Sequence, residues 1–527
     1  MVVRFTSIDL YHEAFMPRYA AVDIGSNSIR LLVADCSLRN GTPQITRLAE
    51  DRQVVRLGST VFKSGAVEAQ VMDEVCAVLR RFQETWRKHD VFGVRAVATS
   101  ATRDASNQAE FVTRASDAVG APIETISGQE EARLIHLGVQ TVWPQSRQQV
   151  LMVDVGGGSA ELIASENGVY RDGYSRPLGA VRLTEVFLKK DPPTENQVRE
   201  LEEYIEEKLT LPLRYLGGRR YDRVIATSAS AAAVVCAANR IARTNREAAD
   251  RKKATAAQVR KLYRDLVTKG VAERRKIPGI GPRRAEIILP GAAVFWKVLE
   301  RFGQEAMFYS VAGVRDGIIA DLTLRGVGRE NVRLSGEQRR AVEALARKFG
   351  VGTKHAKKVS EHALTLFEGL SPLHSLAPSY GKLLEAASYL RDAGHYVSDT
   401  GHHKHSHYLV RNSDLAGFTD GERSFIALLC RYHRKAMPAA RHLEFQSLDV
   451  EQRRALMMLI PILRLADALD RSREQHVQAV EVEIAGETIR LRLTSERDVS
   501  LERWAAESNA ETVRVVYGRS LSLAGSR

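Results

Sequence analysis

The stretch Tyr19-Ala-Ala-Val-Asp23-Ile-Gly25-Ser26-Asn27-Ser28-Ile-Arg-Leu-Leu-Val33 reads as a strand, a tight turn and a second strand. Apolar residues flank a Gly/Ser turn, and glycine tolerates the backbone angles that a hairpin requires. The same pattern returns in Val150-Leu-Met-Val-Asp154-Val-Gly156-Gly157-Gly158-Ser159-Ala-Glu161-Leu-Ile163. Each copy has an aspartate at the end of its first strand. The repetition predicts a duplicated lobe.

The two turns share a chemistry that suits phosphate. Small residues let backbone N–H groups converge on phosphate oxygens, and an aspartate at a strand end can hold a divalent cation directly or through water. One such turn alone is more often purely structural. Two copies favour a phosphate site, whose candidate residues are Gly25, Ser26, Asn27 and Ser28 in the first turn and Gly156, Gly157, Gly158 and Ser159 in the second.

Length and composition bound the class of protein. A chain of 527 residues is too long for one core, so several folding units are expected. Hydrophobic residues make up 44% and charged residues 27%, which is ordinary for a globular chain. Lys and Arg number 77 against 64 Asp and Glu, a net charge of +13. The resulting positive field favours polyanionic partners without selecting among nucleic acid, anionic lipid, nucleotide and polyphosphate.

Cysteine usage and hydropathy bear on location. The four cysteines, Cys36, Cys76, Cys236 and Cys430, lie far apart, which predicts reduced thiols in the cytoplasm. The longest apolar run, residues 229–238, is about half of what a bilayer span needs, so no membrane segment is expected. Residues 1–16 precede and include a second Met, lack an apolar signal core, and are expected to be an N-terminal extension.

Three further segments repeat a strand followed by small residues. A strand over 91–99 runs into Ser100-Ala-Thr-Arg103-Asp104, where a helix is expected to begin. Arg103 would lie near that helix N-terminus, a favourable place for an anion, although a solvated Arg beside a capping segment is as good an interpretation. The other two segments are Thr227-Ser-Ala-Ser230 after a strand, and Ser310-Val-Ala-Gly313-Val-Arg315-Asp316-Gly317.

Taken with Ile126-Ser-Gly-Gln-Glu-Glu131-Ala-Arg-Leu-Ile135, these motifs resemble, in this order, the exopolyphosphatase and guanosine pentaphosphate phosphohydrolase (Ppx/GppA) family of the acetate kinase and actin superfamily. The resemblance covers nearly the whole chain from about Pro17. It implies two actin-like (ribonuclease H-like) lobes, and hydrolysis of a terminal phosphoanhydride in the cleft between them. It also implies a homodimer.

By this resemblance Glu131 matches the general base that activates the attacking water, and a placed base contributes about 10²- to 10⁴-fold. Without this resemblance, the acidic pair Glu130-Glu131 at the start of a helix would be expected only to interact favourably with the helix dipole. Asp154 and Glu161 match the positions associated with Mg²⁺ and water activation, and Arg103 would help to neutralise the phosphate. A carboxylate in an apolar strand needs a partner, so a structural salt bridge at Glu161 is the competing interpretation.

The middle of the chain is strongly basic. Residues 246–284 hold many more Lys and Arg than Asp and Glu, and include an amphipathic helix at about 258–267. A polyanion could lie along this face, with an affinity that falls as salt rises. A solvated helix face is the more ordinary interpretation. We expect no specific binding of nucleic acid.

From about Gly336 the apolar periodicity becomes helical, with helices expected near 337–349, 353–370, 379–393 and 422–433. His355, Asp392 and Asp467 resemble the pattern of an HD-type metal phosphohydrolase, except that Arg391 stands where that pattern has a histidine. Arg cannot replace a metal-binding imidazole, so a degenerate site is expected. The alternative role is to guide polyanion, through His402, His403, Lys404, His405 and Arg411.

Together these features predict an α/β fold of duplicated actin-like lobes, followed by an all-α HD-like domain and a small α/β appendage. The expected ranges are 1–16 for the extension, 17–135 and 136–330 for the two lobes, 331–474 for the helical domain and 475–527 for the appendage. The expected activity is a Mg²⁺-dependent exopolyphosphatase. The alternatives are a guanosine pentaphosphate 5′-phosphohydrolase, a non-catalytic polyphosphate or alarmone sensor, and a relative of sugar and acetate kinases.

Overall fold

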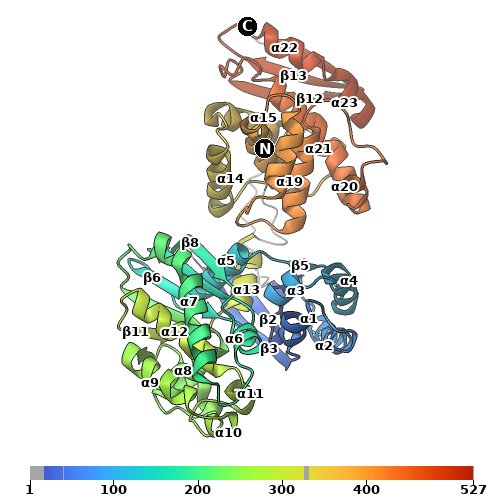
Figure 1. The fold of residues 1–527 in the computed structure, drawn as a ribbon. Helices are drawn as coiled ribbons and strands as arrows, with labels where there is room; N and C mark the ends of the chain where they lie inside the picture. Colours follow the sequence, from blue (N-terminus) through green and yellow to red (C-terminus); the bar gives the residue numbers. More distant parts are fainter. Residues whose placement is uncertain (1–16, 40, 326–331, 526–527) are drawn as a thin grey trace, which may run out of the picture. The chain divides into compact units, whose positions relative to one another are not determined.

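The computed structural model describes residues 17–39, 41–325 and 332–525. The chain divides into two compact units, the first up to Val327 and the second from Gly328. Figure 1 shows the first unit in blue to yellow and the second in dark yellow to red. The predicted extension over 1–16 lies outside the described residues, as does part of the predicted boundary between the second lobe and the helical domain.

The first unit contains two sheets with the same strand plan. The first has the order β3-β2-β1-β4-β5, formed by β1 (Arg18–Ile24), β2 (Ser28–Arg39), β3 (Thr42–Val54), β4 (Gly93–Ala98) and β5 (Ile123–Thr125). The second has the order β10-β11-β9-β6-β7-β8, formed by β6 (Gln149–Val155), β7 (Ala160–Glu166), β8 (Val169–Arg176), β9 (Arg223–Thr227), β10 (Lys253–Thr255) and β11 (Ala306–Tyr309). In both sheets the hairpin predicted from the repeat is present, and a parallel strand pairs with its first arm. The predicted duplication is confirmed.

The first strand of each hairpin lies at the centre of its sheet. In β1, Ala20, Ala21 and Val22 are fully buried, because helices cover both faces of the sheet. Central strands of this kind are apolar on both sides rather than alternating. Each of them ends in the aspartate that the repeat places beside its turn.

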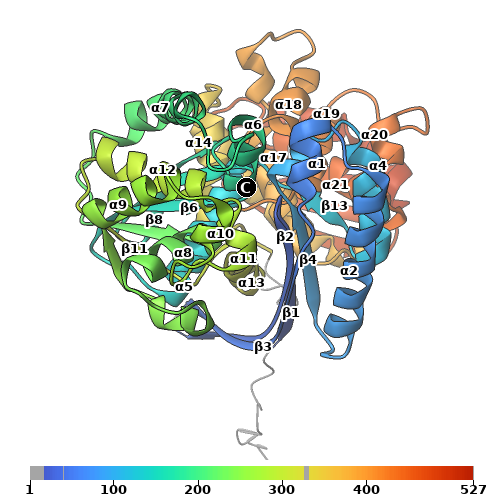
Figure 2. The ribbon, with the colours of Figure 1, turned by 60° about the horizontal axis from the view of Figure 1, so that its bottom comes forward.

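Helices surround the two sheets (Figure 2). Those that follow the first hairpin are α1 (Leu57–Ser64), α2 (Ala69–Arg87), α3 (Ser100–Asp104), α4 (Gln108–Val119) and α5 (Gly128–Val142). Those that follow the second are α6 (Ala180–Phe187), α7 (Glu195–Leu216), α8 (Ser228–Ala238), η1 (Arg243–Ala249), α9 (Ala256–Val267), α10 (Val271–Arg274), α11 (Pro282–Ala285), α12 (Ile288–Arg301) and α13 (Val314–Arg325).

Helices α5 and α13 are exchanged between the two sheets. Helix α5 follows the first sheet in sequence, yet Ala132, Ile135 and Val139 pack on the second sheet. Helix α13 follows the second sheet, yet Ile318 and Ile319 pack on the first. The two helices also pack against each other. The two lobes are therefore joined through a pair of crossed helices.

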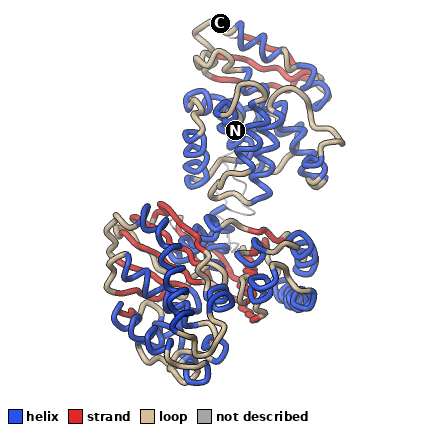
Figure 3. The backbone as a smooth tube through the Cα atoms, viewed as in Figure 1, coloured by secondary structure: helices blue, strands red, loops and turns tan. Residues whose placement is uncertain are grey.

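The second unit is mainly helical and carries a small sheet (Figure 3). Its elements are α14 (Gly336–Lys348), α15 (Thr353–Gly369), α16 (Ser371–His374), α17 (Ser379–Leu390), η2 (Ala393–Tyr396), α18 (His402–Arg411), α19 (Asp420–Tyr432), α20 (Leu443–Gln446), α21 (Val450–Ala468), β12 (Ala479–Ala485), β13 (Thr488–Thr494), α22 (Ser500–Glu507), α23 (Ala510–Tyr517) and β14 (Ser520–Gly525). One core joins the helices to the sheet. The predicted helical domain with an α/β appendage is confirmed.

Two predictions from composition can be compared with the structure. All four cysteines are free and buried. Over the described parts of the chain, every helix is too short or too polar to cross a bilayer.

Candidate active site

The two glycine-lined turns face each other across a cavity of about 590 Å³ in the first unit. A Cβ added to Gly157 would lie 3.0 Å from the backbone N of Asn27, and one added to Gly158 would lie 2.5 Å from Ser26 Oγ. Only glycine permits this close approach. All eight predicted phosphate-binding residues of the turns line the cavity.

The turns have the same internal bonding. Gly25 N–H donates to Ser28 O at 3.2 Å, and Gly156 N–H donates to Ser159 O at 3.0 Å. The segment after each hairpin then donates back to its turn, from Gly58 N–H to Ser26 O and from Val181 N–H to Gly157 O. The repeated bonds give both turns one rigid conformation, with small residues exposed toward the cavity.

Four carboxylates gather between the turns. Asp23, Glu131 and Asp154 line the cavity, and Glu161 lies behind its wall at 1% exposure. Burial, together with the charges of Asp23 and Asp154, raises the pKa of Glu131 to about 7 against the opposing effect of Arg103. Burial, Glu131 and Asp154 together raise the pKa of Glu161 well above its ordinary value. Mutual repulsion of this kind marks a site that a cation would stabilise.

Glu131 is the fourth residue of α5, at the helix end that points into the cleft. The Arg103 guanidinium donates to it at 3.2 Å and also donates to Ile126 O at 2.6 Å. Arg103 is thus held against the carboxylate, and it is absent from the residues that line the cavity. This geometry favours a positioning role for Arg103 over the predicted direct contact with phosphate.

Glu161 has hydroxyl partners. Ser175 Oγ donates to it at 2.7 Å, and Ser159 also bonds it. Among the described residues it makes no salt bridge, so the structural ion pair that competed with a functional role has no support there. Asp154 accepts a hydrogen bond from Thr227 Oγ1, and Thr227 closes the strand that pairs with β6.

A group of arginines extends the cavity on its outer side. Arg30 on β2 and Arg52 on β3 stand directly opposite each other in the antiparallel ladder, where like charges are destabilising. Burial and the neighbouring guanidinium groups lower the pKa of Arg52 to about 10 and that of Arg284 to about 9. Arg stays charged in proteins, so the repulsion remains until an anion relieves it.

Sequence reasoning missed Arg30 and Arg52. The sequence did contain a signal for Arg30, because this residue interrupts the apolar run of the second arm of the hairpin. The basic run over 246–284, interpreted mainly as a solvated face, contributes Arg246 to the cavity wall, and its Arg284 lines an adjoining cavity of about 580 Å³. The two cavities share Asn27, Arg52 and Arg246.

Comparison with known families accounts for this arrangement. The profile of the Ppx/GppA phosphatase family matches residues 36–326, which is more than half of the chain. The chain belongs to the Ppx/GppA phosphatase family. A second profile, Ppx/GppA phosphatase domain III, matches residues 338–509. The family resemblance drawn from the motifs is confirmed.

Solved Ppx/GppA structures agree. A family member from Aquifex aeolicus is 29% identical, with a TM-score of 0.52, and the match covers 59% of this chain and 98% of that one. An exopolyphosphatase-like protein is 28% identical, with a TM-score of 0.54 and coverage of 58% and 97%. An exopolyphosphatase from Cytophaga hutchinsonii is 26% identical, with a TM-score of 0.53 and coverage of 59% and 98%. About two fifths of this chain thus lies beyond the match to each of them.

The cleft of this Ppx/GppA protein has the donor set that a hard divalent cation requires. Its ligand candidates are carboxylate oxygens, which suit Mg²⁺, and their pKa values are raised by one another as well as by burial. A bound cation would offset that repulsion. Of the two predicted metal ligands, Asp154 lines the cavity and Glu161 lies behind its wall, and Asp23 is a further candidate that lines the cavity.

The helical unit brings the predicted HD-like residues together. His355, Asp392 and Asp467 each place a ligand atom within 4.8 Å of the others. The Arg391 side chain enters this triplet, donating from Nε to Asp467 Oδ1 at 2.8 Å and contacting His355 Nε2. His355 Nδ1 lies 2.7 Å from Asp470 Oδ2. A guanidinium therefore occupies the position where a cation would be needed, in agreement with a degenerate site.

The predicted polyanion-guiding residues of α18 need a correction. His402 and His403 are buried, because the helix turns them toward the core together with Ser406. Arg411 donates to Asp420 at 2.8 Å. Only Lys404 and His405 of the five remain accessible without such a partner in the described structure.

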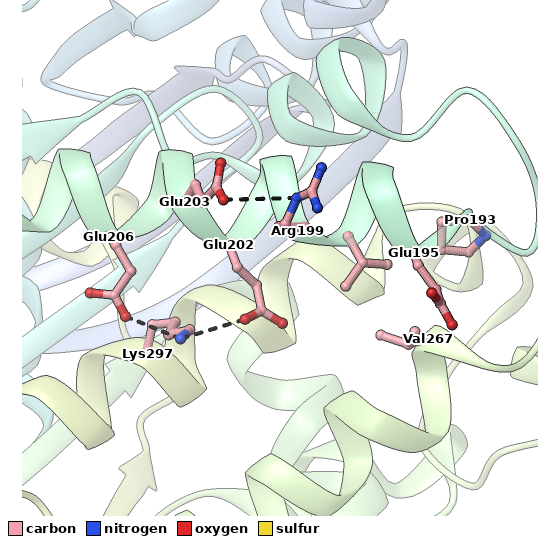
Figure 4. A pocket seen from close by; sticks show the side chains of 9 residues that line it. Pro193, Glu195, Arg199, Glu202, Glu203, Glu206, Val267 and Lys297 are labelled. Atoms are coloured by element: carbon pink, nitrogen blue, oxygen red, sulfur yellow. Dashed lines mark ion pairs between the residues drawn. The ribbon is translucent and has the colours of Figure 1, made fainter.

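A further cavity of the first unit, about 600 Å³ in volume, lies beside α7 (Figure 4). Its walls carry four glutamates, and Lys297 is shared between Glu202 and Glu206. Arg199 pairs with Glu203. This acidic surface would repel a phosphate chain, so the cleft remains the candidate active site.

Proposed function

We propose that this protein is an exopolyphosphatase, which releases the terminal orthophosphate of inorganic polyphosphate by attack of water. The observation that carries the proposal is the position of Glu131. Among the carboxylates that line the cavity between the two phosphate-type turns, Glu131 has a pKa raised to about 7. A base is most effective when its pKa lies near the working pH.

The turns would bind the terminal phosphoryl group. The N–H groups of Ser26, Asn27, Gly157 and Gly158 are the candidate donors, and they are already ordered by the bonds that close each turn. Hydrogen-bond donors that are fixed in place before the substrate binds are, together with neutralisation of charge, the main contribution that a protein makes to phosphoryl transfer. No covalent phosphoenzyme is needed.

Glu131 would take the proton of the attacking water. Arg103 holds the carboxylate in place from the side away from the cavity, through its bonds to Glu131 and to Ile126 O. When bound by Asp154 and Glu161, Mg²⁺ would neutralise charge on the phosphate oxygens. The leaving group is the shortened polyphosphate, whose next phosphates would lie toward Arg30 and Arg52.

A row of four arginines supports an extended polyanion as substrate; its members are Arg30, Arg52, Arg246 and Arg284. Two guanidinium groups opposite each other in a β-ladder repel without a ligand, and a chain of phosphates offers each of them a negative partner. Arg246 and Arg284 continue the row into the adjoining cavity.

The second candidate activity is removal of the 5′ γ-phosphate from guanosine pentaphosphate. The adjoining cavity favours it, because Ala229, Ala232, Ala233 and Cys236 give that cavity an apolar wall on which a purine could rest. Both substrates end in the same anhydride and would use the same turns and the same Glu131.

A paired assay tests the proposal. Phosphate release from long-chain polyphosphate and from guanosine pentaphosphate is measured with the full-length protein, with and without Mg²⁺. We expect faster Mg²⁺-dependent release from polyphosphate. A preference for guanosine pentaphosphate would select the second candidate, and no release from either would leave a non-catalytic sensor.

A further inference from the structure

The helical unit contains a cavity of about 610 Å³ that the proposed reaction does not use. His355 and Asp467, which both contact the fully buried Arg391, form one side of it. The other side is formed by Asp392, His395 on η2, His402 at the start of α18, and His433 just after α19. Three separate elements thus bring three imidazoles to one cavity, and two of them, His395 and His402, face the Asp392 carboxylate.

The reactive atoms of these side chains converge. His395 Nε2 and His402 Nε2 lie 3.8 and 4.0 Å from Asp392 Oδ1. His402 Nε2 and His433 Nε2 are 3.3 Å apart. The edge of a tetrahedral zinc site with Zn–N bonds of about 2.05 Å is about 3.3 to 3.4 Å. The spacing of the two imidazoles therefore matches two ligands of one ion.

The outer nitrogens of the rings are occupied in the way that metal sites require. His433 Nδ1 lies 2.7 Å from Cys430 O and His395 Nδ1 lies 2.6 Å from Asp399 Oδ1. A carbonyl and a carboxylate only accept, so both Nδ1 atoms carry the proton and both Nε2 atoms are bare acceptors. Metal-binding histidines are typically oriented by such an outer contact.

His402 Nδ1 lies 3.3 Å from Asp399 O and 3.4 Å from Arg434 Nη1. In the tautomer that donates to Asp399, its Nε2 is a third bare acceptor. In the other tautomer, Nε2–H would donate to His433 and the cluster would be a hydrogen-bonded pair without an ion. These two states give opposite predictions for metal binding.

Asp392 divides its two oxygens between neighbours. Oδ2 faces Arg473 at 3.2 Å and Arg391 at 3.6 Å. Oδ1 faces the imidazoles. The guanidinium groups therefore saturate one oxygen and leave the other to an ion, which explains how a cation site can lie beside Arg391.

We propose that Asp392, His395 and His402, whose ligand atoms all lie within 4.8 Å of one another, bind one divalent transition-metal ion, with His433 beside His402 as a fourth candidate ligand and Zn²⁺ as the best match. Imidazole nitrogen suits Zn²⁺, Cu²⁺, Fe²⁺ and Ni²⁺, whereas Mg²⁺ prefers oxygen ligands. The site is therefore distinct in metal preference from the carboxylate cleft of the first unit.

Metal content tests the proposal independently of any phosphatase activity. The full-length protein is stripped with a chelator, dialysed against Zn²⁺ alone, and measured by elemental analysis and calorimetry. We expect His402→Ala combined with His433→Gln to lose one equivalent of Zn²⁺. His405→Ala, on the same helix but outside the cluster, should retain it, and so should Asp154→Ala in the cleft.

Equal Zn²⁺ content in the wild type and the double variant would overturn the proposal. So would loss of the equivalent in Asp154→Ala alone. If the double variant fails to fold, Asp399→Ala keeps the test decisive, because its side chain is 92% exposed and orients only His395. Loss of an outer contact costs about 10- to 100-fold in metal affinity. An unchanged affinity in that variant would count against the site.

Discussion

Glu130 and Glu131 are adjacent carboxylates with different surroundings. Glu130 accepts hydrogen bonds from Arg95 and Arg133, which lie in a buried network with Asp321. These partners lower the pKa of Glu130 despite its burial. Glu131 faces the cavity, and burial raises its pKa. One glutamate is thus structural and its neighbour is the candidate base.

Replacing each of the two separates these roles. Glu131→Gln should reduce kcat by about 10²- to 10⁴-fold, because the attacking water loses its base. Glu130→Gln should instead lower the thermal unfolding temperature and leave most of the activity, because it weakens a buried ionic network. Phosphate release and thermal melts of both variants check this. A Glu131→Gln variant with normal kcat would exclude Glu131 as the base.

The raised pKa of Glu131 makes the metal-free protein pH-sensitive. Its ordinary value is 4.5 and its value in the folded state is about 7, so between these the folded state binds more protons than the unfolded one. The free energy of unfolding contributed by this group is therefore retained below about 4.5 and falls as pH rises toward about 7. In chelator, Glu131→Gln should melt above the wild type at about pH 8, and the difference should disappear near pH 4.5. A difference that is the same at both pH values would contradict the assignment.

At the scale of elements, the β2–β3 ladder sets two arginines against each other. Arg52→Ala should raise KM for long polyphosphate by about tenfold or more, the effect expected for losing a charge-assisted bond, and should weaken the dependence of KM on salt. Arg39→Ala, at the far end of β2, is the matched control. Steady-state kinetics over a range of ionic strength would measure the change in KM and in its salt dependence. Equal effects of the two substitutions would mean that the row of arginines does not bind substrate.

The crossing of α5 and α13 depends on glycine. A Cβ on Gly317 would lie 1.8 Å from Leu134 O, whereas a Cβ on Gly313 would meet nothing within 4 Å. Gly317→Ala should therefore push the helices apart and destabilise the protein by about 1 to 3 kcal/mol or more. Gly313→Ala should unfold like the wild type. Chemical denaturation of both variants checks this, and equal stabilities would mean that the crossing tolerates a wider spacing.

The elements were largely predictable from local pattern. The hairpins at Asp23 and Asp154 follow from apolar runs around Gly/Ser turns, and the helices of the second unit follow from their periodicity. The pairing of Arg30 with Arg52 was not predictable, because strand register depends on contacts distant in sequence. The packing of α5 and α13 on exchanged sheets was hidden for the same reason.

At the scale of the whole molecule, each unit has its own core. A ligand that binds one unit should therefore stabilise that unit alone. With Glu131→Gln to prevent turnover, polyphosphate at about 100 times its Kd should stabilise the first unit by about 2.7 kcal/mol. Calorimetry of the full chain should show one transition shifting and another staying in place. A shared shift of both transitions would show that the units unfold together.

The order of domains could be predicted from the sequence, since the change from mixed to helical periodicity near Gly336 is a local signal. The grouping of His355, Asp392 and Asp467 was also anticipated. The convergence of His395, His402 and His433 was not, because their spacing fits no single motif. Only the fold brings η2, α18 and the end of α19 to one cavity.

The exchanged helices also constrain how the cleft can open. Because α5 lies on one sheet and α13 on the other, separation of the lobes must pivot about the place where these helices touch. Glu131 is in the first turn of α5, one of the two helices that touch there, whereas the glycine turns belong to the hairpins of the two sheets. We therefore expect the two turns to move apart to admit and release phosphate. The Glu131 carboxylate should keep nearly the same position throughout the catalytic cycle.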